Sequence, residues 1–486
     1  MSDRIETEIE TEESSAEEGS MENTSPDGEV LSRRDVRIRT MAEEVPWKAV
    51  LKMGLPIAFG MLFMVAYNLV DTYFIGKLGD PYQLAASSLS YPVLMVLIAL
   101  SGITGNGGAS YIARCMGAGR KEEADRTLVL GFEMILVMSL ALMLAGAFAL
   151  DPIVALLGAR GETVSYTKDY TGVLLAGSFF TMGNYALGQL LRSEGSVSYA
   201  TVSMIAGTVS NIILDPVFIF TLGMEIRGAA IATVLGNILS TVICLWVYMS
   251  GRSLLTLSPR YLGFSSRIFG EIMKVGIPHT LEQFLSTASI LVLNNLAAAY
   301  GGLYVAAMGI STRIMSFGNY LYQGIAAGCQ PLMGYNYGAG AYGRMRSLIR
   351  SAIGIITLIE VCVMAAFGLS APFLARLFSE DPTVVSLAAM TLRAAMLILP
   401  FVGTTALVRN VYNAIGMPGF AFTITLVRQL LLYIPFLVAF NALFGYRGLI
   451  HAQPAEELLC LFFSLFLLRR SLARMEERKR EPGEGR

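Results

Sequence analysis

The feature that most constrains this chain is an internal repeat. Compared with itself at a shift of about 221 residues, the sequence aligns glycines, prolines and small residues along most of its length. Gly117 meets Gly338 and Gly195 meets Gly416, with slips of a residue or two near the ends. Single matches arise by chance in a chain with 48 glycines, but a near-constant offset indicates duplication. Duplicated halves in a very apolar chain are typical of secondary transporters, whose substrate cavity lies between the halves.

Composition indicates a polytopic membrane protein. Hydrophobic residues make up 54% of the chain and charged residues only 15%, whereas soluble domains carry about 25% charged residues. Apolar stretches of about 20 residues, long enough to cross a bilayer, recur about twelve times. They begin near Leu51, Leu84, Thr127, Lys168, Ser198 and Gly228, and again near Glu271, Leu303, Leu348, Thr383, Gly419 and Gly448. The predicted fold is therefore all-α, with twelve transmembrane helices in two pseudo-symmetric bundles of six.

The charged segments suggest the domain boundaries. Residues 1–44 are predicted to be a disordered tail, acidic at first and then basic, because its first 29 residues contain almost no large apolar side chain. No secretory signal is recognisable before the first span. Residues 45–250 and 271–470 are predicted to be the two lobes, joined by a cytoplasmic linker at 251–270. Residues 471–486 form a second charged tail.

Loop charges predict the orientation in the membrane. Lys and Arg gather in every second loop, as in 33–52, 114–126, 252–267, 344–350 and 469–474. The alternate loops, such as 300–302, are weakly basic or not basic. Because cytoplasmic loops carry the excess of Lys and Arg, both termini are predicted to be cytoplasmic, in a multi-pass protein of the cell (inner) membrane. Six spans per half make the repeats parallel, related by an axis along the membrane normal.

The sequence contains no pattern typical of an enzyme. It has two histidines that are far apart and five scattered cysteines, without metal-ligand spacing. No phosphate-binding loop is recognisable, so ATP is not expected to drive the protein directly. We therefore expect no enzymatic activity, no resident cofactor and no nucleic-acid partner. An ion gradient is left as the energy source.

Two acidic residues within predicted spans are candidates for binding an ion. Asp71 lies toward the end of the first span and Asp215 within the fifth, and such residues usually face a cavity or pathway. Helical spacing puts Tyr67 on the same face as Asp71, and Asn211 on the same face as Asp215. Pro216 leaves a backbone carbonyl without its helical donor. These oxygens would suit Na⁺ or a proton, although an acid could instead pair with an arginine, and Asp71 could lie at the membrane rim.

The second half does not repeat these acids. The positions that align with Asp71 and Asp215 carry Val292 or Leu293 and Ile434. The halves therefore share glycines and prolines but not carboxylates. This difference predicts that cation chemistry is concentrated in the first half.

Three stretches together resemble one family. They are 68–79, with the sequence NLVDTYFIGKLG, 330–339, with QPLMGYNYGA, and 211–216 followed by 228–233. The chain resembles MATE (multidrug and toxic compound extrusion) transporters over roughly residues 45–470, and the first and third stretches resemble the DinF-like branch. The resemblance implies two six-helix bundles around a central V-shaped cleft. It also implies export of organic cations in exchange for Na⁺ or H⁺.

The resemblance also implies site residues. In that branch, an acid on span one, an Asn and an Asp on span five, and a Thr on span six form the cation site. Here these are Asp71, Asn211, Asp215 and Thr233, and Tyr67 fits the same pattern. A Na⁺ at this site is the only metal we expect.

A second acidic site known in the family is not reproduced. Glu282 lies nearer the start of span seven than that pattern requires, and span ten offers Arg393 instead of an acid. The resemblance therefore does not carry a cation site over to the second lobe. Glu282 and Gln283 are candidates for lining the substrate cleft. Alternatively, Glu282 pairs with an intramembrane arginine such as Arg313 or Arg428.

The sequence thus favours a monomeric antiporter that exports amphipathic or cationic organic compounds by alternating access, with membrane lipid as its surroundings. One alternative is a flippase for a lipid-linked carrier, which would need a basic central cavity. Four arginines in the second half keep it open: Arg313, Arg393, Arg409 and Arg428. A membrane-embedded enzyme or a channel is less consistent with the absence of catalytic clusters.

Overall fold

The computed structural model describes residues 33–480. It leaves out the side chains of 476–480 and of Arg33, Arg34, Ala66, Asn68, Leu69 and Thr72. The acidic part of the predicted N-terminal tail and residues 481–486 lie outside the described residues. Within the described part, every regular element is a helix, as the sequence predicts.

The first half forms six long helical segments. They are α3 (Pro46–Gly76), α4 (Pro81–Gly117), α5 (Lys121–Phe148), α7 (Thr163–Ala176) continued by α8 (Ser178–Ser193), α9 (Val197–Pro216) continued by η1 (Val217–Thr221), and α10 (Glu225–Met249). The short α6 (Leu150–Leu156) lies between α5 and α7. This order follows the six apolar stretches of the sequence.

The second half repeats the arrangement. Its segments are α11 (Ser266–Ala298), α12 (Gly302–Gly338), α13 (Tyr342–Leu369), α15 (Pro382–Met396) with α16 (Leu399–Ala414), and α17 (Pro418–Leu426) with η3 (Val427–Tyr433) and α18 (Ile434–Arg480). The short α14 (Ala371–Arg376) corresponds to α6, and η2 (Pro259–Tyr261) lies in the linker. Within α18, Gly445 adopts φ 59°, which breaks the helix into two spans.

Not every segment is apolar enough to be recognised as a span by composition. Seven helical stretches of the described chain pass a length and hydropathy test, and α15 with α16, bent by 47°, would make an eighth. Neither α11 nor α12 passes. Both contribute polar side chains to the cavity described below. Their polarity therefore reflects a wet interior face rather than a position outside the membrane.

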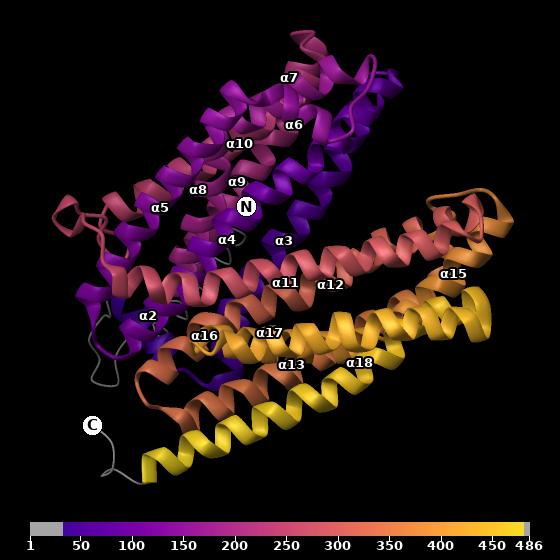
Figure 1. Cartoon of the computed structure of the whole chain (residues 1–486). Coiled ribbons are helices and arrows are strands. Elements are labelled where there is room, and N and C mark those ends of the chain that lie inside the picture. The colour runs from indigo at the N-terminus through magenta and orange to yellow at the C-terminus, as the bar shows by residue number, and fades with distance from the viewer. Residues whose placement is uncertain (1–32, 481–486) are drawn as a thin grey trace, which may run out of the picture.

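The two bundles touch at one end and diverge toward the other. Figure 1 shows α3 to α10 in indigo and magenta above α11 to α18, which run from reddish pink through orange to yellow, with the helices approaching each other near α2. Contacts between the halves come mainly from α12 against α3 and α11 against α4. A side chain at Gly117 would collide with Tyr335, and one at Gly338 would collide with Arg114. Because 117 and 338 are repeat-related, this reciprocal contact is what a two-fold arrangement of parallel repeats requires.

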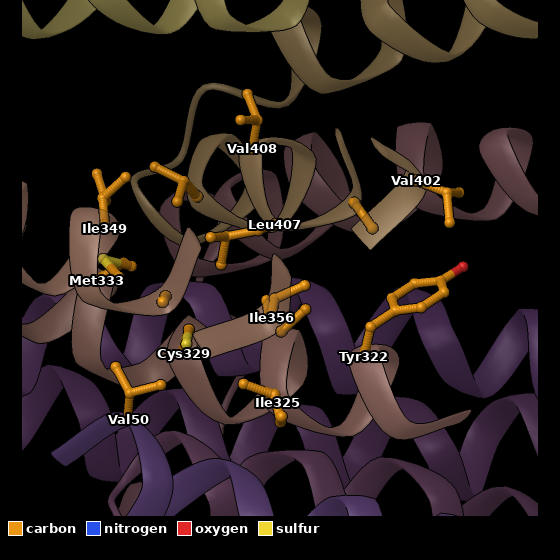
Figure 2. Close-up of a cluster of buried hydrophobic side chains, with 14 of the residues drawn as sticks. Val50, Tyr322, Ile325, Cys329, Met333, Ile349, Ile356, Val402, Leu407 and Val408 are labelled. Carbon is orange, nitrogen blue, oxygen red and sulfur yellow. The ribbon is translucent and has the colours of Figure 1, made fainter. Parts of the chain in front are cut away.

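The main apolar core joins the two halves at this end. Figure 2 shows Ile325, Cys329 and Met333 of α12 between Val50 of α3 and Leu407 of α16, all of them buried. Because one continuous cluster includes residues of both halves, apolar burial stabilises their contact here.

Part of the segment predicted to be a disordered tail is ordered. Residues 33–42 form α2 (Arg33–Ala42), whose Met41 is fully buried. Arg37 donates to the Ser196 hydroxyl of the first half at 2.5 Å, and Asn336 of the second half donates to the Met41 carbonyl at 2.9 Å. The prediction failed here because α2 is too short and polar to read as a helix alone. Its helix depends on contacts with both lobes.

The linker is held by a buried carboxylate in the loop after α8. Glu194 accepts hydrogen bonds from the Ser253 hydroxyl at 2.6 Å and from the Leu254 and Leu255 amides at 3.0 Å. Burial raises the pKa of Glu194, although the bonds from Ser196, Ser253 and Leu255 oppose that shift. This contact anchors the start of the linker to the first lobe.

Candidate cation site and central cavity

The residues predicted to bind a cation meet within the first bundle. Asp71 lies near the end of α3, Asn211 and Asp215 on the last turns of α9, and Thr233 on α10. The Asn211 amide donates to the Thr233 hydroxyl at 3.3 Å, and the Tyr67 hydroxyl lies 3.4 Å from the same atom. Three helices thus bring all five predicted side chains to one polar centre.

This centre has more acceptors than donors. Four buried oxygens have no hydrogen-bond partner among the described residues: Asp71 Oδ1, Asn211 Oδ1 and both carboxylate oxygens of Asp215. Asp71 and Asp215 are close enough for their charges to interact. The described chain contains no Lys or Arg ion pair with either acid. An unpartnered buried carboxylate is costly, so this site favours a bound proton or cation.

The oxygens fit Na⁺ better than a transition metal. Two carboxylates, an amide oxygen and a hydroxyl are hard ligands, which suit a hard cation. Among the described residues, no group of three His, Cys, Asp or Glu could hold a metal ion. The arrangement therefore depends on neutral oxygens as well as on the two acids.

One residue of this centre was not found from the sequence. Tyr170 of α7 interacts electrostatically with Asp71, Tyr67 and Asp215, and lies beside Thr233. Its side chain is 8% exposed. A tyrosine in an apolar helix gives no signal, because 21 tyrosines occur in this chain. Only the packing of α7 against α10 identifies it.

The helix that carries Asp215 changes geometry next to it. α9 ends at Pro216, and the next five residues, Val217–Thr221, form a π-helical turn. The proline has no backbone N–H to donate within the helix, as the sequence predicts. Wide turns of this kind often accompany functional sites in helices.

A cavity of about 880 Å³ lies mainly on the inner face of the second bundle. Glu282 and Gln283 of α11 line it, and Asn106 and Tyr185 contribute from the first bundle. Its charged lining comprises Glu282, Arg313, Arg409, Arg428 and Glu456. The cavity is thus polar and carries both signs of charge.

Glu282 pairs with an intramembrane arginine, but not with one of the two proposed examples. Its Oε2 lies 3.5 Å from Arg409 Nη1, and its Oε1 is buried without a hydrogen-bond partner among the described residues. Arg428 instead pairs with Glu457 at 2.7 Å and with Glu456 at 3.6 Å. Sequence reasoning missed both of these glutamates. Arg393 lies elsewhere, in a separate surface pocket, where it donates to the Gly368 carbonyl.

Comparison with known proteins agrees with this architecture. The family model MatE matches twice, at residues 56–217 and 278–438, which are the two repeats. The multidrug export protein MepA of Staphylococcus saprophyticus is 31% identical over 438 residues, covering 90% of this chain and 96% of the relative. MepA of Staphylococcus aureus strain NCTC 8325 is also 31% identical, with the same coverage.

Solved structures are similar along nearly the whole chain. A MATE crystal structure in complex with MaL6 matches with a TM-score of 0.86 at 28% identity, covering 90% of this chain and 99% of that one. An outward-facing multidrug resistance MATE transporter of the MOP superfamily matches with a TM-score of 0.86 at 28% identity, covering 90% and 98%. The repeat, the helix order and these matches agree, and the chain belongs to the MATE (multidrug and toxic compound extrusion) family.

Proposed function

We propose that this protein is a secondary antiporter that exports amphipathic or cationic organic compounds in exchange for Na⁺ or H⁺. The observation that carries the proposal is the group of four unpartnered buried oxygens around Asp71 and Asp215. Such a group has to be neutralised, and an ion drawn from a gradient would neutralise it. The relatives named as multidrug export proteins support the same direction of transport.

The helix that carries Asp71 also touches the other lobe. α3 packs on α9 near the proposed ion site and on α12 across the interface. Neutralising Asp71 and Asp215 would remove their repulsion, so α3 could repack and change access to the cavity. Ion and substrate occupancy would then be linked, and each would change the affinity for the other by the same factor.

The cavity offers a place for the substrate. Glu282 shares only one carboxylate oxygen with Arg409, and its Oε1 has no hydrogen-bond partner in the described part of the chain. Gln283 adds a neutral polar group to the lining. A cationic compound with apolar groups would find a negative partner there and apolar walls around it.

A flippase for a lipid-linked carrier is less well supported. It would need free positive charge in the cavity, whereas Arg409 and Arg428 are both paired with glutamates. Arg313 lines the cavity, but Arg393 does not. The relatives found by comparison are named as exporters of drugs.

Purified protein in liposomes would test the function. With tetraphenylphosphonium as the probe, we expect accumulation inside vesicles only when a Na⁺ or pH gradient is imposed in the opposite direction. Running each gradient alone identifies the coupling ion. Equal accumulation with and without both gradients would contradict the proposal, as would transport of a lipid-linked pyrophosphate in place of the cation.

We also propose an inner-membrane protein with both termini cytoplasmic, acting as a monomer without a resident cofactor and belonging to the DinF-like branch. The lobes would span 45–250 and 271–470. The alternation of basic loops supports the orientation, because Arg344, Arg346 and Arg350 lie opposite the uncharged loop at 300–302. The stretches around Asp71 and Asp215 support the branch.

Cysteine labelling would test the orientation. Cys362 is exposed, so it is first replaced by serine, and the four other cysteines are buried. A single cysteine is then placed at Gly302 or at Ser347, and intact cells are treated with a membrane-impermeant thiol reagent. We expect labelling at position 302 but not at 347. The reverse pattern would overturn the orientation.

A further inference from the structure

The second bundle contains a buried acid that the antiport scheme above does not use. Glu360 of α13 is 2% exposed, and its carboxyl group has no side-chain hydrogen-bond partner among the described residues, with only the Gly403 backbone amide beside it. Its carboxyl group lies against Gly403 of α16, where a methyl group would collide with it. The side chain therefore occupies a space that exists because residue 403 has no side chain.

Glu360 belongs to a cluster in which acids outnumber bases. The cluster consists of Glu282, Glu360, Glu456, Glu457, Arg409 and Arg428. Its three ion-paired acids face two arginines, and Glu360 adds a fourth carboxylate near Glu457. If all four were ionised, the cluster would carry two uncompensated negative charges in a low-dielectric interior. Such charges are strongly unfavourable unless they are neutralised.

We infer that Glu360 is a proton-binding site of the second lobe, and that its proton exchanges with the central cavity past Glu457 and Arg428. Glu360 and Glu457 do not line the cavity, whereas Arg428 and Glu456 do. Arg428 contacts both glutamates of the adjacent pair, so it joins the buried side of the cluster to the wet side.

A proton fits this position better than a metal ion. No group of three His, Cys, Asp or Glu in the described chain could hold a metal, and the neighbour of the carboxyl group is the backbone of Gly403. A proton needs no coordination shell and converts Glu360 to a neutral acid. The change leaves the pairs of Arg428 and Arg409 intact.

The surroundings of Glu360 contain few other groups that could titrate in its place. The groups that interact with it from neighbouring elements are Tyr322 of α12 and Glu457 of α18. Arg409 of α16, Arg428 of η3 and Cys460 of α18 surround Tyr322 and Glu457 in turn. Arg393 of α15 bonds to Gly368, about two turns further along α13. In Figure 2, the Tyr322 hydroxyl points away from Ile325 and Ile356.

Infrared difference spectroscopy on purified protein without substrate would test the proton site. The parent is the Asp71→Asn, Asp215→Asn double variant, which removes the carboxylates of the first lobe. We expect a pH step to change the carbonyl bands of protonated carboxylic acids in the parent, and Glu360→Gln to remove one component of that change. Glu282→Gln is the matched control and should retain it. An unchanged difference band in Glu360→Gln would overturn the inference.

A second variant covers the case in which Glu360→Gln does not fold. Gly403→Ala forces the carboxyl group to move while keeping it, so the same band should shift. A band at its original position would also contradict the inference.

The link to transport rests on the proposed export function and has its own readout. Adding tetraphenylphosphonium to protein in weakly buffered solution should release protons, which a pH dye reports. Glu360→Gln should release fewer protons than wild type, whereas equal release would overturn the exchange with the cavity. If the probe does not bind at all, the export proposal fails, but the infrared result still decides whether Glu360 holds a proton.

Discussion

The two bundles place acids in their interiors in opposite ways. In the first, Asp71 and Asp215 lie beside neutral oxygens, with no basic partner in the described chain. In the second, Glu282 and Glu457 are each paired with an arginine, at 3.5 and 2.7 Å. A carboxylate without a partner can accept an ion from outside, whereas a paired one is largely neutralised already. The comparison teaches that one backbone plan, used twice, can supply an unpaired pair of aspartates in one lobe and a network of glutamate–arginine pairs in the other, where Glu360 is the exception.

The same contrast extends to the helices that carry these groups. Pro216 and Pro435 align in the repeat. The π-helical turn follows Pro216 in the first lobe, as Val217–Thr221, but precedes Pro435 in the second, as Val427–Tyr433. The wide turn of the second lobe therefore contains Arg428 and Gln429, both of which line the cavity. The proline is thus retained in both halves, but the π-helical turn lies after it in one half and before it in the other.

The largest effect is expected from removing the charges of the first lobe. Asp71→Asn and Asp215→Asn keep the shape of the side chain but remove the group that binds the ion. We expect each to abolish gradient-driven export in liposomes. The effect of the ion on substrate affinity, usually about 5- to 150-fold in a coupled pair of sites, should be lost as well. Asp169→Asn, an exposed change on α7, is the matched control and should behave like wild type. Glu282→Gln should be milder than either, and an equal loss in Glu282→Gln would erase the contrast between the lobes.

Breaking the ion pair of the second lobe should affect stability more than coupling. Arg428→Met leaves Glu456 and Glu457 buried without their partner. We expect it to lower the free energy of unfolding by about 3–5 kcal/mol, the cost of an uncompensated buried charge. Thermal unfolding in detergent would measure the loss. Adding Glu457→Gln to Arg428→Met should recover part of it, and a double variant no more stable than the single one would contradict the pairing.

Smaller effects are expected from the neutral ligands of the first lobe. Asn211→Ala and Thr233→Ala each remove one oxygen and their mutual hydrogen bond of 3.3 Å. We expect each to weaken ion affinity by about 0.5–1.5 kcal/mol, or about two- to tenfold. The ion concentration that gives half-maximal export would report this. No change in either variant would argue that the two aspartates bind the ion without help.

The smallest effect is expected at Tyr170. Tyr170→Phe removes a hydroxyl beside Thr233 and keeps the ring. We expect the change in ion affinity to be below about 1 kcal/mol, because the hydroxyl supports the ligands from outside. The half-maximal ion concentration measures it, with Tyr166→Phe on the same helix as the control. A loss as large as that of Asp215→Asn would make Tyr170 a principal ligand.

Much of the fold follows from sequence because its signals are regular. Apolar runs long enough to cross a bilayer define the segments, and the repeat defines the two lobes. α2 (Arg33–Ala42) was missed, since its helix depends on contacts with both lobes and not on its own composition. Local patterns cannot report contacts made between residues that are far apart in the chain.

The sites divide in the same way. Asp71 and Asp215 stood out because acids within spans are rare and because the stretches around them resemble a known family. Glu360 did not stand out, since its partner at the 221-residue shift is Ser139, a neutral residue that gives no hint of a charge. The partner of Glu282 could not be predicted from the sequence either, because Arg313, Arg409 and Arg428 are equally plausible before the side chains are placed. Pairing depends on rotamers and helix rotation, which the sequence does not specify.

Equilibrium binding of the probe at two ion concentrations tests most directly whether the first lobe holds the coupling ion. In wild-type protein, raising the coupling ion should weaken tetraphenylphosphonium binding, because occupancy of the two sites is linked. In Asp215→Asn, the affinity for the probe should no longer depend on the ion, whereas Glu282→Gln should retain the dependence. An Asp215→Asn protein whose affinity still changes with the ion as in wild type would contradict the account.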